Sequence, residues 1–399
     1  MTGTQEAITR LASLKQYLQH SPDNVPLLLD AVATAIAAGD FKEAGLFVDE
    51  ALRYAPASPE AHAHAGYIRM LDKDFNGAID HYKIVLEAGL AEPVIRYNLA
   101  FSYYRIGLYD DALSQAQGIE WGDNNPDDLR IQASLLIARC LYRMERFDEA
   151  IKELQAKELQ ALPNSEQNAE VLGLMALLYC DDNQVENALI YSARSLDAEP
   201  AGFEALVARA TCFVIQKEYD QAYADYERIL ELHPTVGRAW SGLGQIQFHR
   251  FQFNEAVASL RTAIDFMPDH LGTWHLLGWA HMATENYEKA RSAFENALEL
   301  DRAFAETHGC LASLYAVTGE HKKAQRHIKL AQKLDPSSMG HLYAEMVLLQ
   351  KGGKTKESQQ LFNSALNTPN TLFGGPLRQL VEARMRELEE KNKDPRKEI

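Results

Sequence analysis

The sequence predicts an all-α protein, an α-solenoid superhelix of antiparallel helix pairs with a capping helix at each end. Three observations carry this prediction. An alanine recurs on a 34-residue grid, an aromatic residue precedes most of these alanines by three positions, and proline recurs between the units. Several columns that repeat together are the signature of stacked helix-pair repeats, in which each unit contacts only its neighbours.

The alanine column fixes the number of units. Its ten positions are Ala44, Ala78, Ala112, Ala150, Ala188, Ala222, Ala256, Ala290, Ala324 and Ser358. The steps between them are 34 residues, except for two steps of 38, which start at Ala112 and Ala150. The column therefore predicts about ten repeats and two four-residue insertions.

Three further columns explain how each unit folds. The aromatic column, three residues before each alanine, is Phe41, Phe75, Tyr109, Phe147, Val185, Tyr219, Phe253, Tyr287, His321 and Thr355. Twelve residues before the alanine a small residue recurs, at Gly66, Ala100, Ala138, Ala176, Ala210, Gly244, Gly278 and Ala312. Proline follows at Pro56, Pro200, Pro234, Pro268 and Pro336. Small residues let the paired backbones approach, the aromatic residue plugs the gap beside them, and proline ends the unit.

The stretch from Trp274 to Ala297 shows the pattern most fully. It reads W-x2-L-G from Trp274 to Gly278 and A-x3-F from Ala290 to Phe294. This pattern resembles the tetratricopeptide repeat, and the resemblance covers residues 4–390. It implies a superhelical array whose first helices line a concave groove that binds peptides or helices.

The chain order follows from the grid. Residues 4–22 are expected to form an N-terminal capping helix, 25–126 repeats one to three, and 131–202 repeats four and five with flanking insertions. Residues 203–372 are expected to form repeats six to ten, and residues 376–392, which start at Pro376, a C-terminal capping helix.

The insertions near 127–130 and 165–168 flank the fourth repeat. Residues 119–126 are expected to form a polar loop after a degenerate second helix, and residues 152–160 a lengthened second helix. Two interpretations stay open: a local change in superhelix pitch, or a flexible joint between two arms.

The composition of the chain limits the kinds of partner and compartment that we expect. The chain has 399 residues and a formal net charge of −16, which disfavours nucleic acid as a partner. The four cysteines, Cys140, Cys180, Cys212 and Cys310, have no C-x-x-C spacing and indicate reduced residues in a reducing compartment. The N-terminus carries no signal-peptide pattern, and no apolar stretch reaches the ~18 residues of a membrane helix. These features predict a cytoplasmic protein without membrane insertion.

Enzyme motifs are absent from the sequence. It contains no P-loop, G-x-S-x-G, H-E-x-x-H or G-x-G-x-x-G pattern, and its thirteen histidines are scattered. We therefore expect no catalytic residues, no metal site and no cofactor.

The resemblance gives candidate binding residues at the groove positions of the first helices. In repeats two to four these are Tyr67, Met70, Tyr97, Phe101, Tyr104, Arg105, Arg139, Tyr142 and Arg143. In repeats seven and eight a second patch comprises Phe248, His249, His275, Trp279 and Met282. Aromatic side chains offer contact area at low entropic cost, and arginine binds carboxylates. The alternative is that half of these residues fill the interfaces between adjacent first helices.

The sequence thus predicts a non-enzymatic scaffold that binds a peptide or helix of a partner protein, with self-association as a further property. The alternative is a bacterial secretion-type chaperone, because residues 59–126 loosely resemble the three-repeat chaperones of type III systems. Binding of acidic chaperone tails is not expected, since Ala63 and Tyr67 stand where that clamp has lysine and asparagine.

Overall fold

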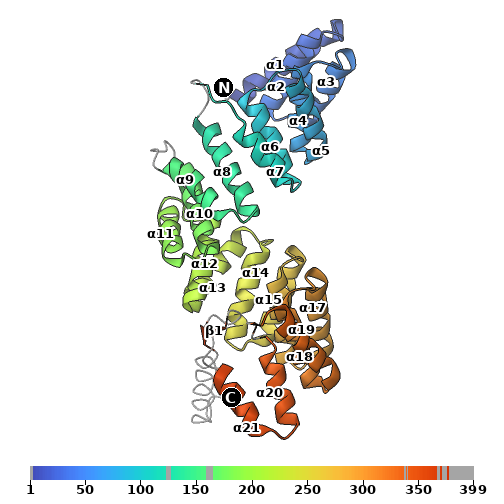
Figure 1. Cartoon of the computed structure of the whole chain (residues 1–399). Helices are drawn as coiled ribbons and strands as arrows, with labels where there is room; N and C mark the ends of the chain where they lie inside the picture. The colour runs from blue at the N-terminus through green and yellow to red at the C-terminus, as the bar shows by residue number, and fades with distance from the viewer. Residues whose placement is uncertain are drawn as a thin grey trace, which may run out of the picture. The chain divides into compact units, whose positions relative to one another are not determined.

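The structure is a computed structural model that describes residues 3–122, 127–158, 165–336, 338, 340–365, 369–370 and 375–376. Almost all of these residues lie in helices that follow one another in pairs (Figure 1). The helices are α1 (Gly3–His20), α2 (Val25–Ala38), α3 (Phe41–Tyr54), α4 (Pro59–Leu71), α5 (Phe75–Glu87), α6 (Pro93–Arg105), α7 (Tyr109–Gln117), α8 (Asp127–Arg143), α9 (Phe147–Glu158), α10 (Ser165–Asp181), α11 (Val185–Ala198), α12 (Phe203–Gln216), α13 (Tyr219–Leu232), α14 (Gly237–His249), α15 (Phe253–Phe266), α16 (Leu271–Ala283), α17 (Tyr287–Leu300), α18 (Ala305–Thr318), α19 (His321–Leu334), α20 (Leu342–Lys351) and α21 (Thr355–Ala365). The predicted all-α solenoid of helix pairs is confirmed.

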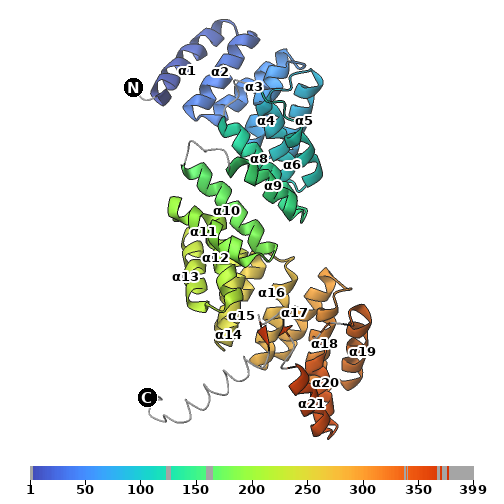
Figure 2. The ribbon, with the colours of Figure 1, turned by 60° about the vertical axis from the view of Figure 1, so that its left-hand side comes forward.

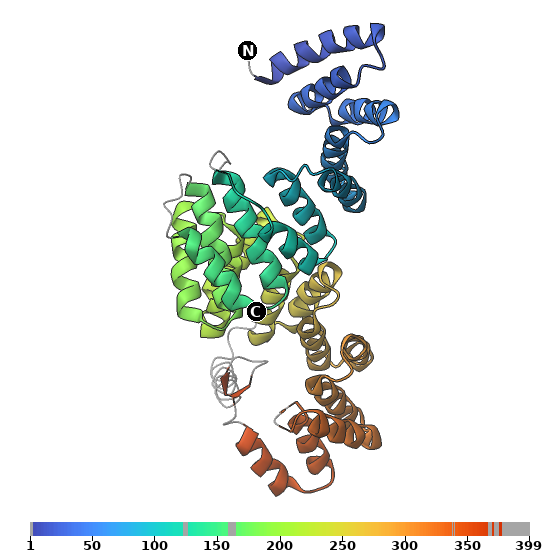
Figure 3. The same cartoon turned by 45° about the horizontal axis from the view of Figure 1, so that its top comes forward.

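Each repeat turns between its two helices through a residue in the left-handed conformation. This residue is the fifteenth of every repeat: Gly39, Lys73, Gly107, Glu145, Asn183, Lys217, Phe251, Glu285, Gly319 and Gly353. The φ angles of the six residues other than glycine lie between 58° and 64°. A single left-handed residue ends the first helix and lets the second run back along it (Figure 3).

The alanine column is buried throughout. All nine alanines, from Ala44 to Ala324, have 0% of their surface exposed. The small-residue column lies opposite a bulky side chain of the second helix. A Cβ added to Gly278 would come within 2.2 Å of Phe294, and one added to Gly66 within 2.8 Å of Tyr82. Close approach of the paired helices therefore requires glycine at these positions.

The expectation that the aromatic column plugs this gap is wrong. The ring against Gly278 belongs to Phe294, seven residues after Tyr287, and Phe294 is fully buried. Phe41, the first residue of the column, is 41% exposed, and Phe75 and Tyr109 are half-buried. The reason is position: each column residue opens the second helix beside the turn, whereas the ring against Gly278 comes from seven residues further along that helix.

The proline column lies between consecutive units, as expected, and it also accepts hydrogen bonds. The indole Nε1 of Trp240 donates to the Pro234 carbonyl at 2.8 Å, and Trp274 donates to Pro268 at 2.7 Å. His62 occupies the same repeat position, and its Nε2 lies 2.9 Å from the Pro56 carbonyl. A ring N–H at the fourth position of a repeat thus fixes the first helix to the preceding turn.

The two insertions lengthen first helices. Helices α8 and α10 each have 17 residues, whereas most first helices have 13 or 14. The lengthened second helix expected at 152–160 extends beyond the described residues: α9 is described as Phe147–Glu158, and residues 159 and 160 lie outside the described part of the chain. Four residues add about one helical turn. The degenerate second helix before residue 119 is α7, with nine residues.

The chain divides into two compact units, 1–171 and 172–399, and the division falls within α10. In the first unit, α1 packs against α2 and buries Leu11, Leu14 and Leu18 (Figure 2). In the second unit, one apolar cluster centres on Phe294 and Leu311.

At the C-terminal end, the first residue of the predicted capping helix lies in a strand. Strands β1 (Pro369–Asn370) and β2 (Gly375–Pro376) pair antiparallel, so Pro376 lies in a strand and does not open a helix. The rest of the capping helix expected at 376–392 falls outside the described residues.

Candidate functional site

The candidate residues of repeats two to four lie on three neighbouring first helices, α4, α6 and α8. We call this set the aromatic patch: Tyr67, Met70, Tyr97, Phe101, Tyr104, Arg105, Arg139, Tyr142 and Arg143. Tyr97, Phe101 and Arg105 contact one another in a row, and most of the other members contact rings or charged groups outside the set.

Helix α6 carries the centre of the aromatic patch. The rings of Tyr97 and Phe101 stack with centroids 6.4 Å apart and an interplanar angle of 24°. Phe75, which opens α5, meets Phe101 edge-on at 6.4 Å. The Arg105 guanidinium lies 4.6 Å from the centre of the Phe75 ring and 5.6 Å from that of Phe101. Cation–π contacts of this kind hold a charged group at a defined place on an apolar surface.

The next turn of α6 meets α8 through tyrosines. Tyr104 contacts Tyr109 with ring centroids 5.7 Å apart. Arg143 Nε donates a hydrogen bond to the Tyr109 hydroxyl at 3.0 Å, and its guanidinium lies 5.4 Å from the ring centre. Tyr142 faces Phe147, with centroids 5.9 Å apart. The arginine is therefore oriented before any partner binds.

An ion pair borders the same row of rings. Arg139 Nη2 lies 2.9 Å from Glu170 Oε1, and both side chains are partly exposed. Burial raises the pKa of Tyr97, with Arg139 opposing and Glu170 adding to this effect. Burial also raises the pKa of Tyr104. Both phenols therefore stay protonated near neutral pH and can donate hydrogen bonds to a ligand.

Helix α4 contributes less to this surface. Tyr67 is 36% exposed. The sulfur of Met70 accepts a hydrogen bond from the Tyr82 hydroxyl at 3.3 Å, and Asn98 Nδ2 donates to that hydroxyl at 3.2 Å. Met70 is thus partly an interface residue, as the alternative interpretation of the sequence held.

Four residues of the second patch are half-buried and pack against neighbouring aromatic rings. His249 stacks on Tyr219 at 5.0 Å, and burial lowers the pKa of His249 to about 4. Trp279 meets Phe294 and Tyr343 edge-on at 6.0 and 5.9 Å. Met282 packs against the cluster around Phe294. Phe248 contacts Phe253 at 5.3 Å.

His275 does not belong to an exposed surface, and its inclusion in the second patch is a wrong prediction. Its side chain is 2% exposed. Its Nε2 lies 2.9 Å from Thr307 Oγ1 in the next repeat, and its ring stacks on Phe304 at 5.8 Å. This fifth residue of its repeat therefore faces the neighbouring first helix.

Three contributors to the aromatic patch escaped the sequence analysis: Phe75, Tyr109 and Glu170. Phe75 and Tyr109 belong to the aromatic column that was assigned to packing, although their rings contact Phe101 and Tyr104 of the aromatic patch. Glu170 is the second residue of repeat five. The groove positions that gave Arg139 in repeat four would also have given Glu170 if they had been applied to repeat five.

The described residues offer no arrangement for metal binding, because no three His, Cys, Asp or Glu side chains converge among them. Burial raises the pKa of the Cys140 thiol to about 12, and burial also raises that of Cys310, so neither is an activated nucleophile. Within the described part of the chain, no helix combines the length and the apolar character needed to cross a bilayer.

Known protein families match the repeats directly. Tetratricopeptide repeat models match residues 4–65, 216–270 and 272–304. Anaphase-promoting complex subunit 3 of Schizosaccharomyces pombe is 27% identical over 36% of this chain and 22% of that protein. BBSome complex member BBS4 of Bos taurus is 21% identical over 69% of this chain and 52% of that protein. The chain thus spans between about a fifth and about half of the length of these relatives.

Solved structures with a similar course of the chain cover about half of it. The tetratricopeptide repeat protein YrrB, described as having an unusual peptide-binding site, covers 50% of this chain and 97% of its own, with 22% identity and a TM-score of 0.38. The pilF protein of Pseudomonas aeruginosa covers 54% of this chain and 96% of its own, with 15% identity and a TM-score of 0.45.

Proteins of this repeat type generally act as protein–protein interaction scaffolds. The 34-residue grid, the buried alanine column and the three stretches matched by the repeat models agree on one assignment. The chain is a tetratricopeptide repeat protein.

Proposed function

We propose that this chain is a non-enzymatic scaffold that grips a peptide or a helix of a partner protein across α4, α6 and α8. The observation that carries the proposal is the row of Tyr97, Phe101 and Tyr104 along α6. These rings are half-buried and held by neighbouring rings, so little rotamer freedom is lost when a ligand covers them. Binding energy concentrates on such aromatic and arginine anchors.

The arginines of the aromatic patch indicate the chemistry of the ligand that would fit it. Arg105 is exposed and has no carboxylate partner among the described residues, while its guanidinium is held over Phe75. Arg139 is already paired with Glu170. We therefore infer a ligand with apolar or aromatic side chains along α6 and a carboxylate that reaches Arg105.

Other features support this role. Two similar proteins are named as subunits of multi-protein complexes, the anaphase-promoting complex and the BBSome. The four cysteines are buried free thiols, which favours a reducing, cytoplasmic compartment. Self-association of the chain would be measured by analytical ultracentrifugation before any binding experiment.

A peptide-display selection on the full chain tests the proposal. Selected peptides are titrated against the wild-type chain, against Tyr97→Ala plus Tyr104→Ala, and against Tyr17→Ala plus Tyr54→Ala as a control. Tyr17 and Tyr54 are exposed tyrosines of α1 and α3. We expect the first pair of substitutions to weaken binding at least tenfold and the second to leave it unchanged. Equal losses would contradict the assignment, and ligands that are apolar throughout would favour a shielding chaperone.

A further inference from the structure

Helix α19 differs in charge from the rest of the chain. It contains the five cations Lys322, Lys323, Arg326, Lys329 and Lys333 and no aspartate or glutamate. The whole chain has a formal net charge of −16. A second helix of the same repeat type, α17, carries the carboxylates Glu288, Glu295 and Glu299. The positive charge is therefore a local feature of α19.

Four of these cations lie on one face. Lys322, Arg326, Lys329 and Lys333 follow one another at intervals of four, three and four residues, which places them along one side of a helix. All four are exposed, and together with Gln325 and Leu330 they line a shallow depression. We call this set of four the α19 cationic face. It extends over about 16 Å of helix.

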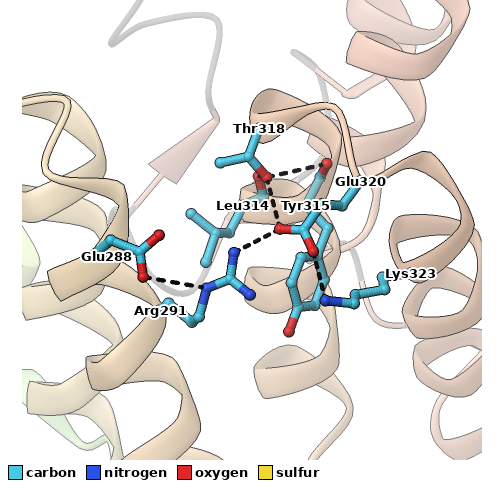
Figure 4. A network of polar contacts seen from close by, with 7 residues as sticks. All are labelled: Glu288, Arg291, Leu314, Tyr315, Thr318, Glu320 and Lys323. Carbon is cyan, nitrogen blue, oxygen red and sulfur yellow. Dashed lines mark hydrogen bonds and ion pairs between the residues drawn. The ribbon is translucent and has the colours of Figure 1, made fainter.

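The remaining cation of α19, Lys323, forms an ion pair within the protein. Lys323 Nζ lies 2.5 Å from Glu320 Oε2, while Arg291 Nη2 of α17 lies 2.5 Å from Glu320 Oε1 (Figure 4). Thr318 Oγ1 lies 3.4 Å from the same carboxylate, at the end of α18. These contacts lower the pKa of Glu320 to about 2 and fix the start of α19 against its neighbours.

The α19 cationic face takes no part in such contacts. None of its four side chains forms an ion pair with a described residue. Like charges three or four residues apart destabilise a helix. Lys322 also lies in the first turn, where the helix dipole disfavours a cation. Lys333 lies in the last turn, where the dipole favours a cation, so the unfavourable contribution of the face comes from the repulsion between its cations and from Lys322. An anionic partner would relieve this repulsion.

We propose that the α19 cationic face binds an acidic segment of a polypeptide, with carboxylates spaced to match the four cations. Its length suits a short segment of about three helical turns. Nucleic acid fits less well, because a continuous polyanion would extend beyond these four cations to surfaces of an acidic chain, such as the exposed carboxylates of α17. The α19 cationic face and the aromatic patch lie on different helices. Binding at one can therefore be disproved without affecting the proposal for the other.

The test uses the full chain and two quadruple variants with the same change of charge. The first replaces the face: Lys322→Gln, Arg326→Gln, Lys329→Gln and Lys333→Gln. The control replaces four exposed cations on four other second helices: Lys42→Gln, Arg228→Gln, Arg261→Gln and Lys289→Gln. Thermal melting shows that each variant folds, and we expect the first to melt no lower than the wild type, because its repulsion is removed.

The probe is a fluorescein-labelled 16-residue helical peptide with glutamates at intervals of four, three and four residues. Two other probes are compared with it: the same peptide with glutamine at those positions, and a 16-nucleotide oligothymidylate. Fluorescence anisotropy is recorded at low and high salt. We expect the face variant to bind the acidic peptide at least about tenfold more weakly than the wild type, and the control variant to bind within about twofold. Binding should weaken as salt rises.

Three results would overturn the proposal. Equal affinity of the wild type and the face variant would show that the face is not used. Equal losses in both quadruple variants would show that only net charge matters. Tighter, face-dependent binding of the oligothymidylate would assign the face to nucleic acid.

Discussion

Arg105 lies over two aromatic rings at once, 4.6 Å from the centre of the Phe75 ring and 5.6 Å from that of Phe101. Phe75 opens α5, whereas Arg105 ends α6, so the contact joins two consecutive repeats. The stacking fixes the plane of the guanidinium and leaves its edge for a ligand. A partner carboxylate would then meet a donor that is already oriented, which reduces the entropic cost of binding.

Replacement of this arginine tests its role. We expect Arg105→Ala to weaken the binding of a selected peptide ligand by about 1–2 kcal/mol, because an oriented, charge-assisted hydrogen bond is lost. Isothermal titration calorimetry measures the change. Arg53→Ala is the matched control, since Arg53 stacks on Tyr54 at 5.1 Å in α3, outside the aromatic patch. Equal effects of the two substitutions would remove Arg105 from the site.

Close approach of α16 and α17 predicts the effect of a single methyl group. Gly278→Ala would place its Cβ 2.2 Å from the fully buried ring of Phe294, so the pair must separate. We expect the free energy of unfolding to fall by about 1–3 kcal/mol. In contrast, Gly45→Ala in α3 meets only Ile68 Cγ2 at 4.0 Å and should stabilise the chain by about 0.5–1 kcal/mol. Urea unfolding measures the free energy of unfolding of both variants and distinguishes the expected loss from the expected gain.

The alanine column predicts a second packing effect. Ala290 has none of its surface exposed and lies in the cluster around Phe294. Ala290→Leu adds three carbon atoms to this packed contact and should cost about 1–3 kcal/mol. Differential scanning calorimetry of the variant measures this loss, and an unchanged melting temperature would contradict the repeat register.

Acid should destabilise the second unit through His275. Burial, followed by the charge of His270, lowers the pKa of His275 to about 4 from an ordinary value of 6.5. The unfolded chain therefore takes up this proton more readily, so stability is full above pH 6.5 and falls as the pH drops toward 4. The loss amounts to roughly 2–4 kcal/mol. The variant His275→Gln should show a flatter dependence of its unfolding midpoint on pH, and an equal slope would exclude His275 as the cause.

Repetition explains what could be predicted from the sequence. A column such as the nine alanines is observed many times, so its burial and spacing were predictable without the structure. The exposure of a single groove residue depends on its partner in the next repeat. Tyr97 remains half-buried on α6, whereas His275, at the same repeat position, is buried against Thr307.

The insertions show a second limit. Four extra residues between two repeats are visible as a longer step in the column, but they can extend the preceding helix, the loop or the following helix. Asp127 and Asp128 lie in the first turn of α8, where the helix dipole favours acidic residues, and so they would have indicated the observed extension. The run of good helix formers at 152–160 indicates an extension of α9 as well, and its last two residues lie outside the described part of the chain.

The central claim, that the wall formed by α4, α6 and α8 recognises another polypeptide, is tested most directly by photo-crosslinking. A benzophenone amino acid replaces Tyr67, which is 36% exposed on α4, or Leu46, which is 60% exposed on α3. Mass spectrometry then measures the yield of crosslinks to a selected peptide ligand. We predict strong crosslinking from position 67 that unlabelled ligand abolishes, and background crosslinking from position 46. Strong crosslinking from position 46, with background from position 67, would contradict the account.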